Sequence, residues 1–95
     1  MIRCIKLRHY RKNTLRAFVD LELPHTGLVL RDCCLHEKDG EKWITFLTRS
    51  HAGDNGVISW QPVIEFSAGA DPGQFQRQAI AAIDVFMAQN LGPAS

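Results

Sequence analysis

The segment from Leu15 to Leu23 places an apolar residue at every second position, and this pattern restricts the fold more than any other feature of the chain. The odd positions hold Leu, Ala, Val, Leu and Leu, whereas the even positions hold Arg, Phe, Asp and Glu. A repeat of two residues is the period of a β-strand that buries one face. The sequence therefore predicts a strand here, in a sheet whose second face is open to water, a ligand or another subunit.

Four further strands are predicted around this one, at residues 2–8, 28–37, 42–48 and 57–66. In the first of them, Ile5 and Leu7 are expected to share one face of the strand. The opposite face of that strand is expected to carry Cys4, Lys6 and Arg8.

Polar stretches that contain turn-forming residues separate the predicted strands, at residues 9–13, 23–27, 39–40 and 49–56. Pro24 and Gly27 end the second strand, because proline lacks a backbone donor and glycine permits a positive φ. Asp39-Gly40 is a strong signal for a tight hairpin turn. Pro62 indicates a sheet edge or a bulge in the last strand. Short connections between consecutive strands imply antiparallel pairing.

The period changes to that of a helix after Asp71-Pro72. Asp is favoured as an N-cap, and Pro is favoured at the first helical position. The residues that follow form one apolar stripe at helical spacing: Phe75, Ala79, Ala82, Ile83 and Phe86. The helix is expected to end near Asn90, because Gly92-Pro93 cannot continue it.

These elements predict an α+β fold, in which an antiparallel sheet of four to five strands is followed by one C-terminal helix packed on one face. The 95 residues correspond to one β-β-β-β-β-α domain over residues 1–91, with a loose tail at 92–95. A domain of this size buries little apolar surface, so that a homodimer is an ordinary way to gain stability. We therefore expect a homodimer.

The sequence predicts a cytoplasmic protein with no membrane partner. No apolar run approaches the roughly 20 residues that a membrane-spanning helix needs, and the N-terminus has no apolar core of signal-peptide length. The three cysteines, Cys4, Cys33 and Cys34, are odd in number, and two are neighbours. They do not form a disulfide framework, which favours a reducing compartment.

The basic residues are concentrated at the start of the chain, although the net charge is only +1. Residues 1–16 carry a charge of +6, and the other 79 residues carry −5. This asymmetry can produce a local positive field on a nearly neutral protein. The sequence therefore predicts a nucleic-acid-binding surface made by Arg3, Lys6, Arg8, Arg11, Lys12 and Arg16, with Phe18 positioned to stack on an unpaired base.

Several segments resemble the stage V sporulation protein G family (SpoVG), whose members are small bacterial nucleic-acid-binding regulators. The similar stretches are the alternating apolar and basic start at residues 2–8 and the strands at 15–21, 28–33 and 43–47. A polar insert and a C-terminal helix follow in both. The segment that matches the family's basic contact region, residues 67–78, contains Arg77 as its single basic residue. No site residue is therefore transferred from the family.

The resemblance implies a small nucleic-acid-binding regulatory or accessory module, with DNA as the expected ligand. At the level of architecture, strands followed by one helix, with a basic sheet surface, are also similar to dimeric coactivator-type proteins that bind single-stranded DNA. Fold by itself does not fix function. The alternative is a protein–protein interaction or structural module that uses its open sheet face or an unpaired strand edge.

Each candidate site also has a structural interpretation. The basic residues could form a solvated strand face, with Phe18 covered by a loop or a second subunit. Trp43 and Trp60 could form a stacking platform, but core or dimer-interface packing is more common for tryptophan. No cofactor is predicted.

Neither a metal site nor an enzyme is predicted. Cys33, Cys34 and His36 are close in sequence, but adjacent cysteines on a strand point to opposite faces and cannot easily share one ion. Ser50, His51 and Asp54 could form a triad on paper. We interpret their segment as a hairpin loop instead, because neighbouring loop residues rarely hold catalytic geometry.

Overall fold

The computed structural model describes residues 1–90, and within them it contains six strands and one helix. In chain order these are β1 (Arg3–Lys12), β2 (Leu15–Leu23), β3 (Leu28–Lys38), β4 (Glu41–Thr45), β5 (Thr48–Ala52), β6 (Ile58–Pro62) and α1 (Pro72–Asn90). The predicted tail at 92–95 and the helix stop at Gly92-Pro93 lie outside the described residues.

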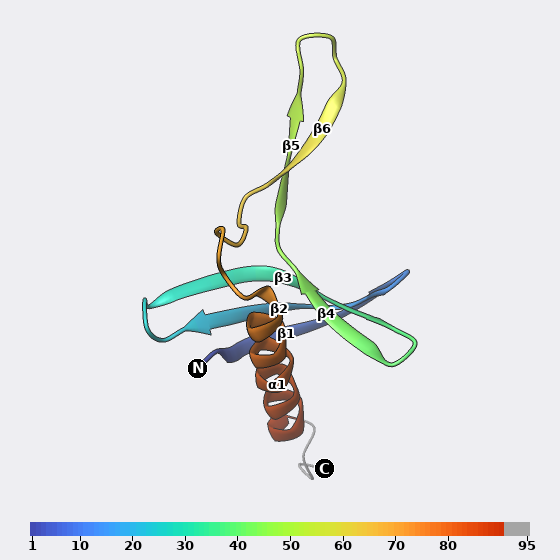
Figure 1. The fold of residues 1–95 in the computed structure, drawn as a ribbon. Helices are drawn as coiled ribbons and strands as arrows, with labels where there is room; N and C mark the ends of the chain where they lie inside the picture. Colours follow the sequence, from blue (N-terminus) through green and yellow to red (C-terminus); the bar gives the residue numbers. More distant parts are fainter. Residues whose placement is uncertain (91–95) are drawn as a thin grey trace.

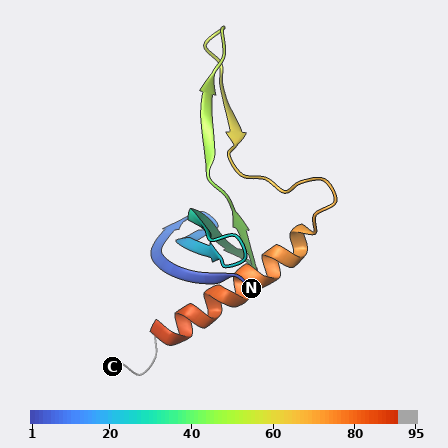
Figure 2. The same cartoon turned by 90° about the vertical axis from the view of Figure 1, so that its left-hand side faces the viewer.

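The strands form two separate antiparallel sheets. The first has four strands in the order β1-β2-β3-β4, and the second is the hairpin β5-β6. The helix crosses one side of the four-stranded sheet, as Figures 1 and 2 show. The predicted α+β class is therefore confirmed, with the last hairpin outside the main sheet.

The core lies between this sheet and α1, and it confirms the alternation in the second strand from Ala17 to Leu23. Leu15 lies outside the core, because the pairing of β2 with β3 shifts between Leu15 and Ala17. Ala17, Val19 and Leu21 are buried, and the helix contributes Ala79 and Ile83 to the same cluster. From β3 and β4, the core receives Cys33, Leu35 and Ile44. The predicted helical stripe therefore does face the sheet.

A bulge in β1 changes which side chains of that strand face the core. The pairing with β2 shifts by one residue between Cys4 and Lys6, so that Ile5 is the extra residue. Cys4 and Leu7 pack against the core, whereas Ile5 is exposed. The prediction that Ile5 and Leu7 share one face of the strand, with Cys4 on the opposite face, was therefore wrong.

Two predicted loops are largely strand. The first hairpin extends to Lys12, and its turn contains Asn13 at a φ of 56°, a left-handed conformation that asparagine tolerates. The predicted polar loop at 49–56 is also wrong over its first half, because residues 48–52 form β5 and pair with β6. Backbone pairing with an apolar strand outweighs the low strand preference of this polar segment.

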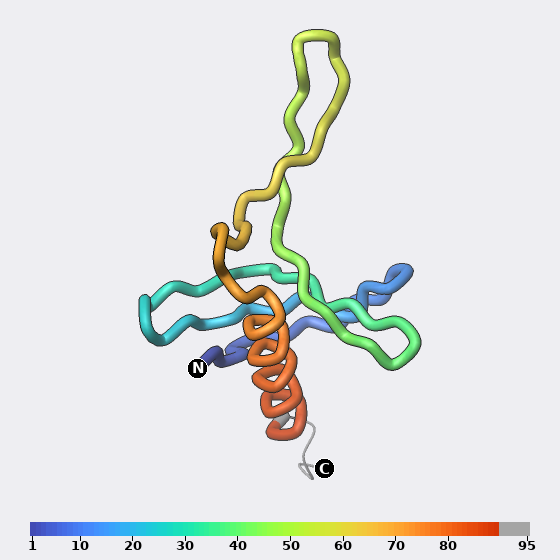
Figure 3. Tube along the Cα trace, viewed as in Figure 1, coloured from blue at the N-terminus to red at the C-terminus, as the bar shows by residue number. Residues whose placement is uncertain are grey.

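The second hairpin stands away from the rest of the molecule. We call residues 47–63 the arm, which comprises β5, β6 and the turn between them. At its base, the Val63 amide donates a hydrogen bond to the Leu47 carbonyl at 3.4 Å. In Figures 1 and 2 the arm points in the opposite direction to the C-terminal end of α1. The trace in Figure 3 shows that β4 runs directly into it.

Three phenylalanines hold the base of the arm against the start of the helix. Phe46 precedes the arm, Phe66 follows it, and Phe75 lies in the first turns of α1. Their ring centroids are 5.3–5.7 Å apart in all three pairings, two of them edge-to-face. The helix begins nearby, where the Asp71 carboxylate accepts a hydrogen bond from the Gln74 amide at 3.1 Å, as predicted for its N-cap.

Within residues 1–90, no helix has the length and apolar character that crossing a membrane requires.

Candidate nucleic-acid interface

The sheet face opposite α1, which we call the open face, carries a row of cross-strand neighbours. Arg8 of β1 lies opposite Phe18 of β2, Phe18 lies opposite Cys34 of β3, and Cys34 lies opposite Thr45 of β4. Paired residues of antiparallel strands point to the same side of a sheet. This row therefore crosses all four strands on the side that the helix does not cover.

Arg8, Phe18 and Tyr10 form a cationic aromatic group at one end of the row. The Arg8 guanidinium carbon lies 4.9 Å from the centroid of the Phe18 ring, within the range of a cation–π interaction. The Tyr10 ring lies 5.5 Å from the Phe18 ring at an angle of 38°. Tyr10 and Arg8 are exposed, so that this group offers both a positive charge and ring surface to solvent.

His36 and Trp43 form a second ring stack on the open face, on β3 and β4. Their rings lie 5.3 Å apart and are nearly parallel, at 9°. The His36 ring nitrogens lie 3.0 Å from the hydroxyls of Thr14 and Thr45, one on each side. Burial lowers the pKa of His36 below its usual 6.5, because desolvation penalises the charged ring. Burial therefore favours the uncharged form of the His36 ring.

A buried carboxylate lies on the same face. Asp20 accepts the Asp32 amide at 3.0 Å and the Arg31 guanidinium at 2.9 Å. Asp32 has a φ of 55° and belongs to a bulge in β3, where the pairing with β2 shifts. Asp20 therefore holds this bulge and has its own cationic partner in Arg31.

The structure brings three of the seven predicted contact residues together. Lys6, Arg8 and Phe18 line a small cavity of about 60 Å³, whose other walls are Asp20 and Asp32. Lys6 lies opposite Asp20 in the strand pairing. In residues 1–90, no ion pair is formed by Lys6 or Arg8 within 4.0 Å.

The other four predicted residues lie apart from this group. Arg3 pairs with Glu22 at 3.4 Å, and the Arg16 guanidinium donates to the carbonyls of Asn13 and Leu15. Arg11 and Lys12 lie at the far end of β1, and nine residue steps of a strand separate Lys12 from Arg3 by about 30 Å. The +6 segment is therefore a long stripe and not one compact patch.

Sequence reasoning missed Tyr10 and His36 as members of the open face. Tyr10 falls in the predicted turn at residues 9–13, although it continues the alternation of Lys6 and Arg8 by two residues. For His36, the sequence suggests only the role of a metal ligand. Its place opposite Trp43 follows from the Asp39-Gly40 turn, which sets the register of β3 and β4. Both signals were present in the sequence.

The geometry gives little support to a catalytic triad at Ser50 and His51 or to a metal site at the cysteines. Ser50 and His51 are adjacent in β5, so that their side chains point to opposite faces of the arm. Burial raises the pKa of the Cys33 thiol to about 12, and the neighbouring Asp20 adds to this shift. Over residues 1–90, no group of three or more His, Cys, Asp and Glu side chains is arranged to hold a metal ion.

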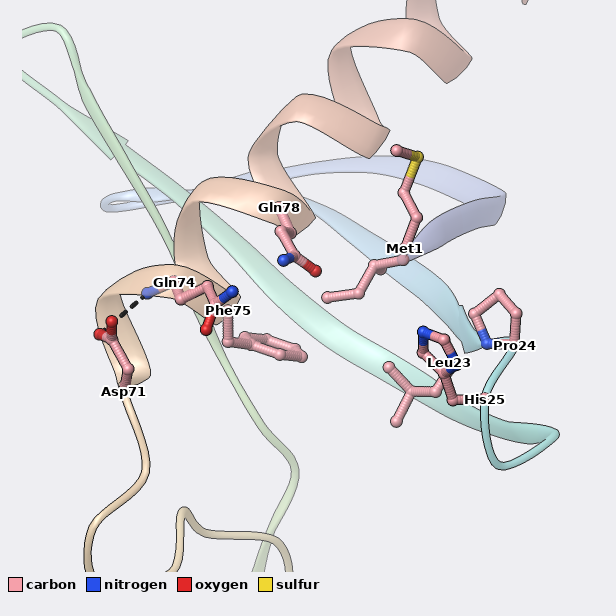
Figure 4. A pocket seen from close by; sticks show the side chains of 9 residues that line it. Met1, Leu23, Pro24, His25, Asp71, Gln74, Phe75 and Gln78 are labelled. Carbon is pink, nitrogen blue, oxygen red and sulfur yellow. Dashed lines mark hydrogen bonds between the residues drawn. The ribbon is translucent and has the colours of Figure 1, made fainter.

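A separate pocket of about 400 Å³ lies at the start of α1, next to the β2–β3 turn (Figure 4). Its apolar wall is formed by Ile2, Leu23 and Phe75, which pack at the edge of the core. The carboxylate of Asp71 points to the Gln74 amide, which it caps. This pocket is an extension of the core edge with one exposed imidazole, His25, at its rim.

Comparisons with known proteins do not add to this description. No protein-family model, curated protein or solved structure matches the chain significantly. The resemblance to the SpoVG family therefore stays a prediction, and function has to be inferred from the open face itself.

Proposed function

We propose that this chain is a regulatory or accessory module that binds single-stranded nucleic acid, with DNA as the expected ligand, on its open face. The observation that carries the proposal is the Arg8–Phe18–Tyr10 group on the open face. In this group the Arg8 guanidinium lies over the Phe18 ring, and the Tyr10 ring lies beside it. Single strands are bound by such a combination of cations for phosphates and rings for bases.

The spacing of the rings supports an extended ligand. Phe18 lies on β2, and Trp43 lies on β4, with β3 between them. Adjacent strands are about 4.8 Å apart, and Trp43 lies two residues along β4 from Thr45, which is level with Phe18. Phe18 and Trp43 are therefore separated by about 12 Å. A strand of unpaired bases that crosses the sheet would meet the two groups in succession, and the backbone between them would pass near Cys34.

The arrangement of charges favours phosphate contact at Lys6 and Arg8. Glu22 is paired with Arg3, and Asp20 is paired with Arg31, so that the two acids of β2 already have cationic partners. Within residues 1–90, Asp32 is the carboxylate that lines the Lys6–Arg8 cavity without an ion pair. Sequence would be read weakly, because every base has a ring face that can stack. Electrostatic capture with stacking is the mechanism that these residues support.

The proposal is tested by fluorescence anisotropy with a labelled oligothymidylate of about 16 nucleotides, near the upper end of known site sizes. Titration at about 50 and 200 mM salt measures the number of phosphate contacts, since each contact contributes about −0.7 to the logarithmic slope for single strands. Absence of binding at the lower salt concentration would overturn the proposal. Duplex DNA and oligouridylate of the same length serve as competitors.

Two variants separate charge from stacking. Arg8→Ala is expected to weaken binding and to reduce the salt slope by about 0.7. Phe18→Leu keeps an apolar side chain but removes the ring, and is expected to weaken binding about fivefold or more with an unchanged slope, because stacking contributes about 1–3 kcal/mol per base. Arg77→Ala is the matched control, since Arg77 is an exposed arginine on α1. An equal loss in the control would contradict the proposed surface.

A further inference from the structure

The arm is built as an amphipathic ribbon. Strand pairing places Ile58, Trp60 and Pro62 on one face with Thr48, Ser50 and Ala52. Along β5 and β6 the other face carries the polar side chains of Arg49, His51, Ser59 and Gln61. Exposed Leu47 and Val63 continue this second face at the base of the arm. Trp60 is 70% exposed and Ile58 is 64% exposed, so that the apolar face of the ribbon is in contact with water.

An isolated hairpin of this kind is not stable in water without a surface to cover its apolar face. A single two-stranded hairpin is marginally stable at best, and all ten residues of β5 and β6 are exposed. Exposed apolar patches with a polar rim mark sites of protein association. The polar face has too few cations for a phosphate backbone, because Arg49 is its single permanently charged residue.

The same chain has a surface that fits this ribbon. A groove of about 530 Å³ lies between residues 1–4 and the second half of α1, where Ala81, Ala82 and Val85 line it. Val85 is 57% exposed, and the lining is largely apolar. We call this the α1 groove. Along α1 its lining extends from Gln78 to Gln89.

The arm of one molecule cannot reach its own α1 groove. The Phe46–Phe66–Phe75 cluster fixes the base of the arm at the start of the helix, and the arm points away from the C-terminal end of α1 (Figures 1 and 2). The longest dimension of the molecule, 55 Å, reflects this separation. An arm that occupies this groove must therefore come from another molecule.

We propose that two copies of this chain form a two-fold dimer, in which the apolar face of each arm docks in the α1 groove of the other copy. The origin of the two surfaces supports a second copy as the occupant, because both belong to this chain and the arm does not reach its own groove. In a two-fold dimer each copy contributes the apolar face of its arm and the ten residues that line its groove. The two contacts are equivalent by symmetry, and the open face stays uncovered. This inference does not depend on nucleic-acid binding.

The dimer is tested by sedimentation equilibrium of the full chain, which is expected to give twice the 10.7 kDa of the monomer. Trp60→Ala in the arm and Val85→Glu in the groove are each expected to weaken the dimer at least tenfold. Gln61→Ala lies on the polar face of the arm, and Ala88→Glu adds the same charge to the helix outside the groove. Both controls should sediment as the parent does.

Mixing the two disruptive variants distinguishes docking in the groove from pairing between arms. A mixture of Trp60→Ala and Val85→Glu chains retains one intact contact per heterodimer, so that dimers should partly return. Two outcomes would overturn the proposal: a monomer at all concentrations, or a Val85→Glu chain that dimerises as well as the parent. The second outcome would show that the arms associate without the groove.

Fluorescence gives a measurement that does not depend on mass. In a Trp43→Phe chain, Trp60 is the sole tryptophan. Its emission is expected to move to shorter wavelength as the protein concentration rises, because docking removes the indole from water. Val85→Glu in the same background should keep the emission of an exposed indole. Emission of an exposed indole at all concentrations in the Trp43→Phe chain would contradict the proposal.

Discussion

The side-chain amide of Gln76 pairs with both backbone groups of Ile44. Its oxygen accepts the Ile44 amide at 2.7 Å, and its nitrogen donates to the Ile44 carbonyl at 2.9 Å. β4 is an edge strand, and these two bonds reproduce on the helix the pairing that a fifth strand would supply. One glutamine therefore fixes the helix to the sheet and blocks part of an exposed edge.

Replacing Gln76 with alanine is expected to destabilise the domain by about 1–3 kcal/mol, because the half-buried Ile44 amide loses its partner. Urea unfolding followed by circular dichroism measures this change. Gln78→Ala, at an exposed position two residues further along the helix, should change stability by no more than about 0.5 kcal/mol. Equal stability of the two variants would contradict the assigned role of Gln76.

Removing the Asp20 carboxylate is expected to cost about 1–3 kcal/mol, because the Asp32 amide and the Arg31 guanidinium lose their acceptor. Glu22→Ala is the matched control on the same face of β2, since Glu22 also pairs with an arginine but does so at the surface. Exposed pairs contribute about 0–1 kcal/mol. Chemical denaturation of Asp20→Ala and Glu22→Ala should therefore give clearly different midpoints.

The lowered pKa of His36 predicts that acid weakens the fold. Because the folded state disfavours the protonated ring, the unfolded state binds more protons once the pH falls below about 6.5. Stability should be full above this value and decrease as the pH falls from it toward the folded-state pKa. His36→Gln should flatten this part of the curve of unfolding free energy against pH. Identical slopes for parent and variant would contradict the assignment.

Cys33 is expected to resist thiol reagents in the folded protein. With a pKa of about 12 and a buried sulfur, it has almost no thiolate in mildly alkaline buffer. In a chain that carries Cys4→Ser and Cys34→Ser, reaction with a chromogenic disulfide should be slow until urea is added. Rapid labelling in native buffer would show that the core between α1 and the sheet opens readily.

Phe66→Ala is expected to loosen the arm more than the sheet. The change removes two ring pairings, with Phe46 and Phe75, and each contributes about 0.5–1.5 kcal/mol beyond its buried area. Amides of β5 and β6 should exchange faster with solvent, while those of β2 and β3 stay protected. Val63→Ala, at an exposed position on the arm, should leave both sets of amides as they are.

The local periods of the sequence determined much of this fold. Alternation over residues 17–23 predicted the inner face of β2, although Leu15 lies beyond a shift in the pairing and outside the core. The N-cap at Asp71 predicted the start of α1. Both signals are short-range, because they depend on residues within one strand or one helical turn. The concentration of basic residues before Asp20 also predicted a positively charged surface that includes Arg8, with Phe18 beside it.

Only the tertiary structure decided which residues meet and which surfaces stay bare. The bulge at Ile5 moved Cys4 to the core, and pairing with β6 turned a polar loop into β5. Neither feature has a local signal, because each depends on a partner strand that the periodicity of one segment cannot specify. The separation of the arm from the sheet follows from the Phe46–Phe66–Phe75 contacts, which join residues far apart in sequence.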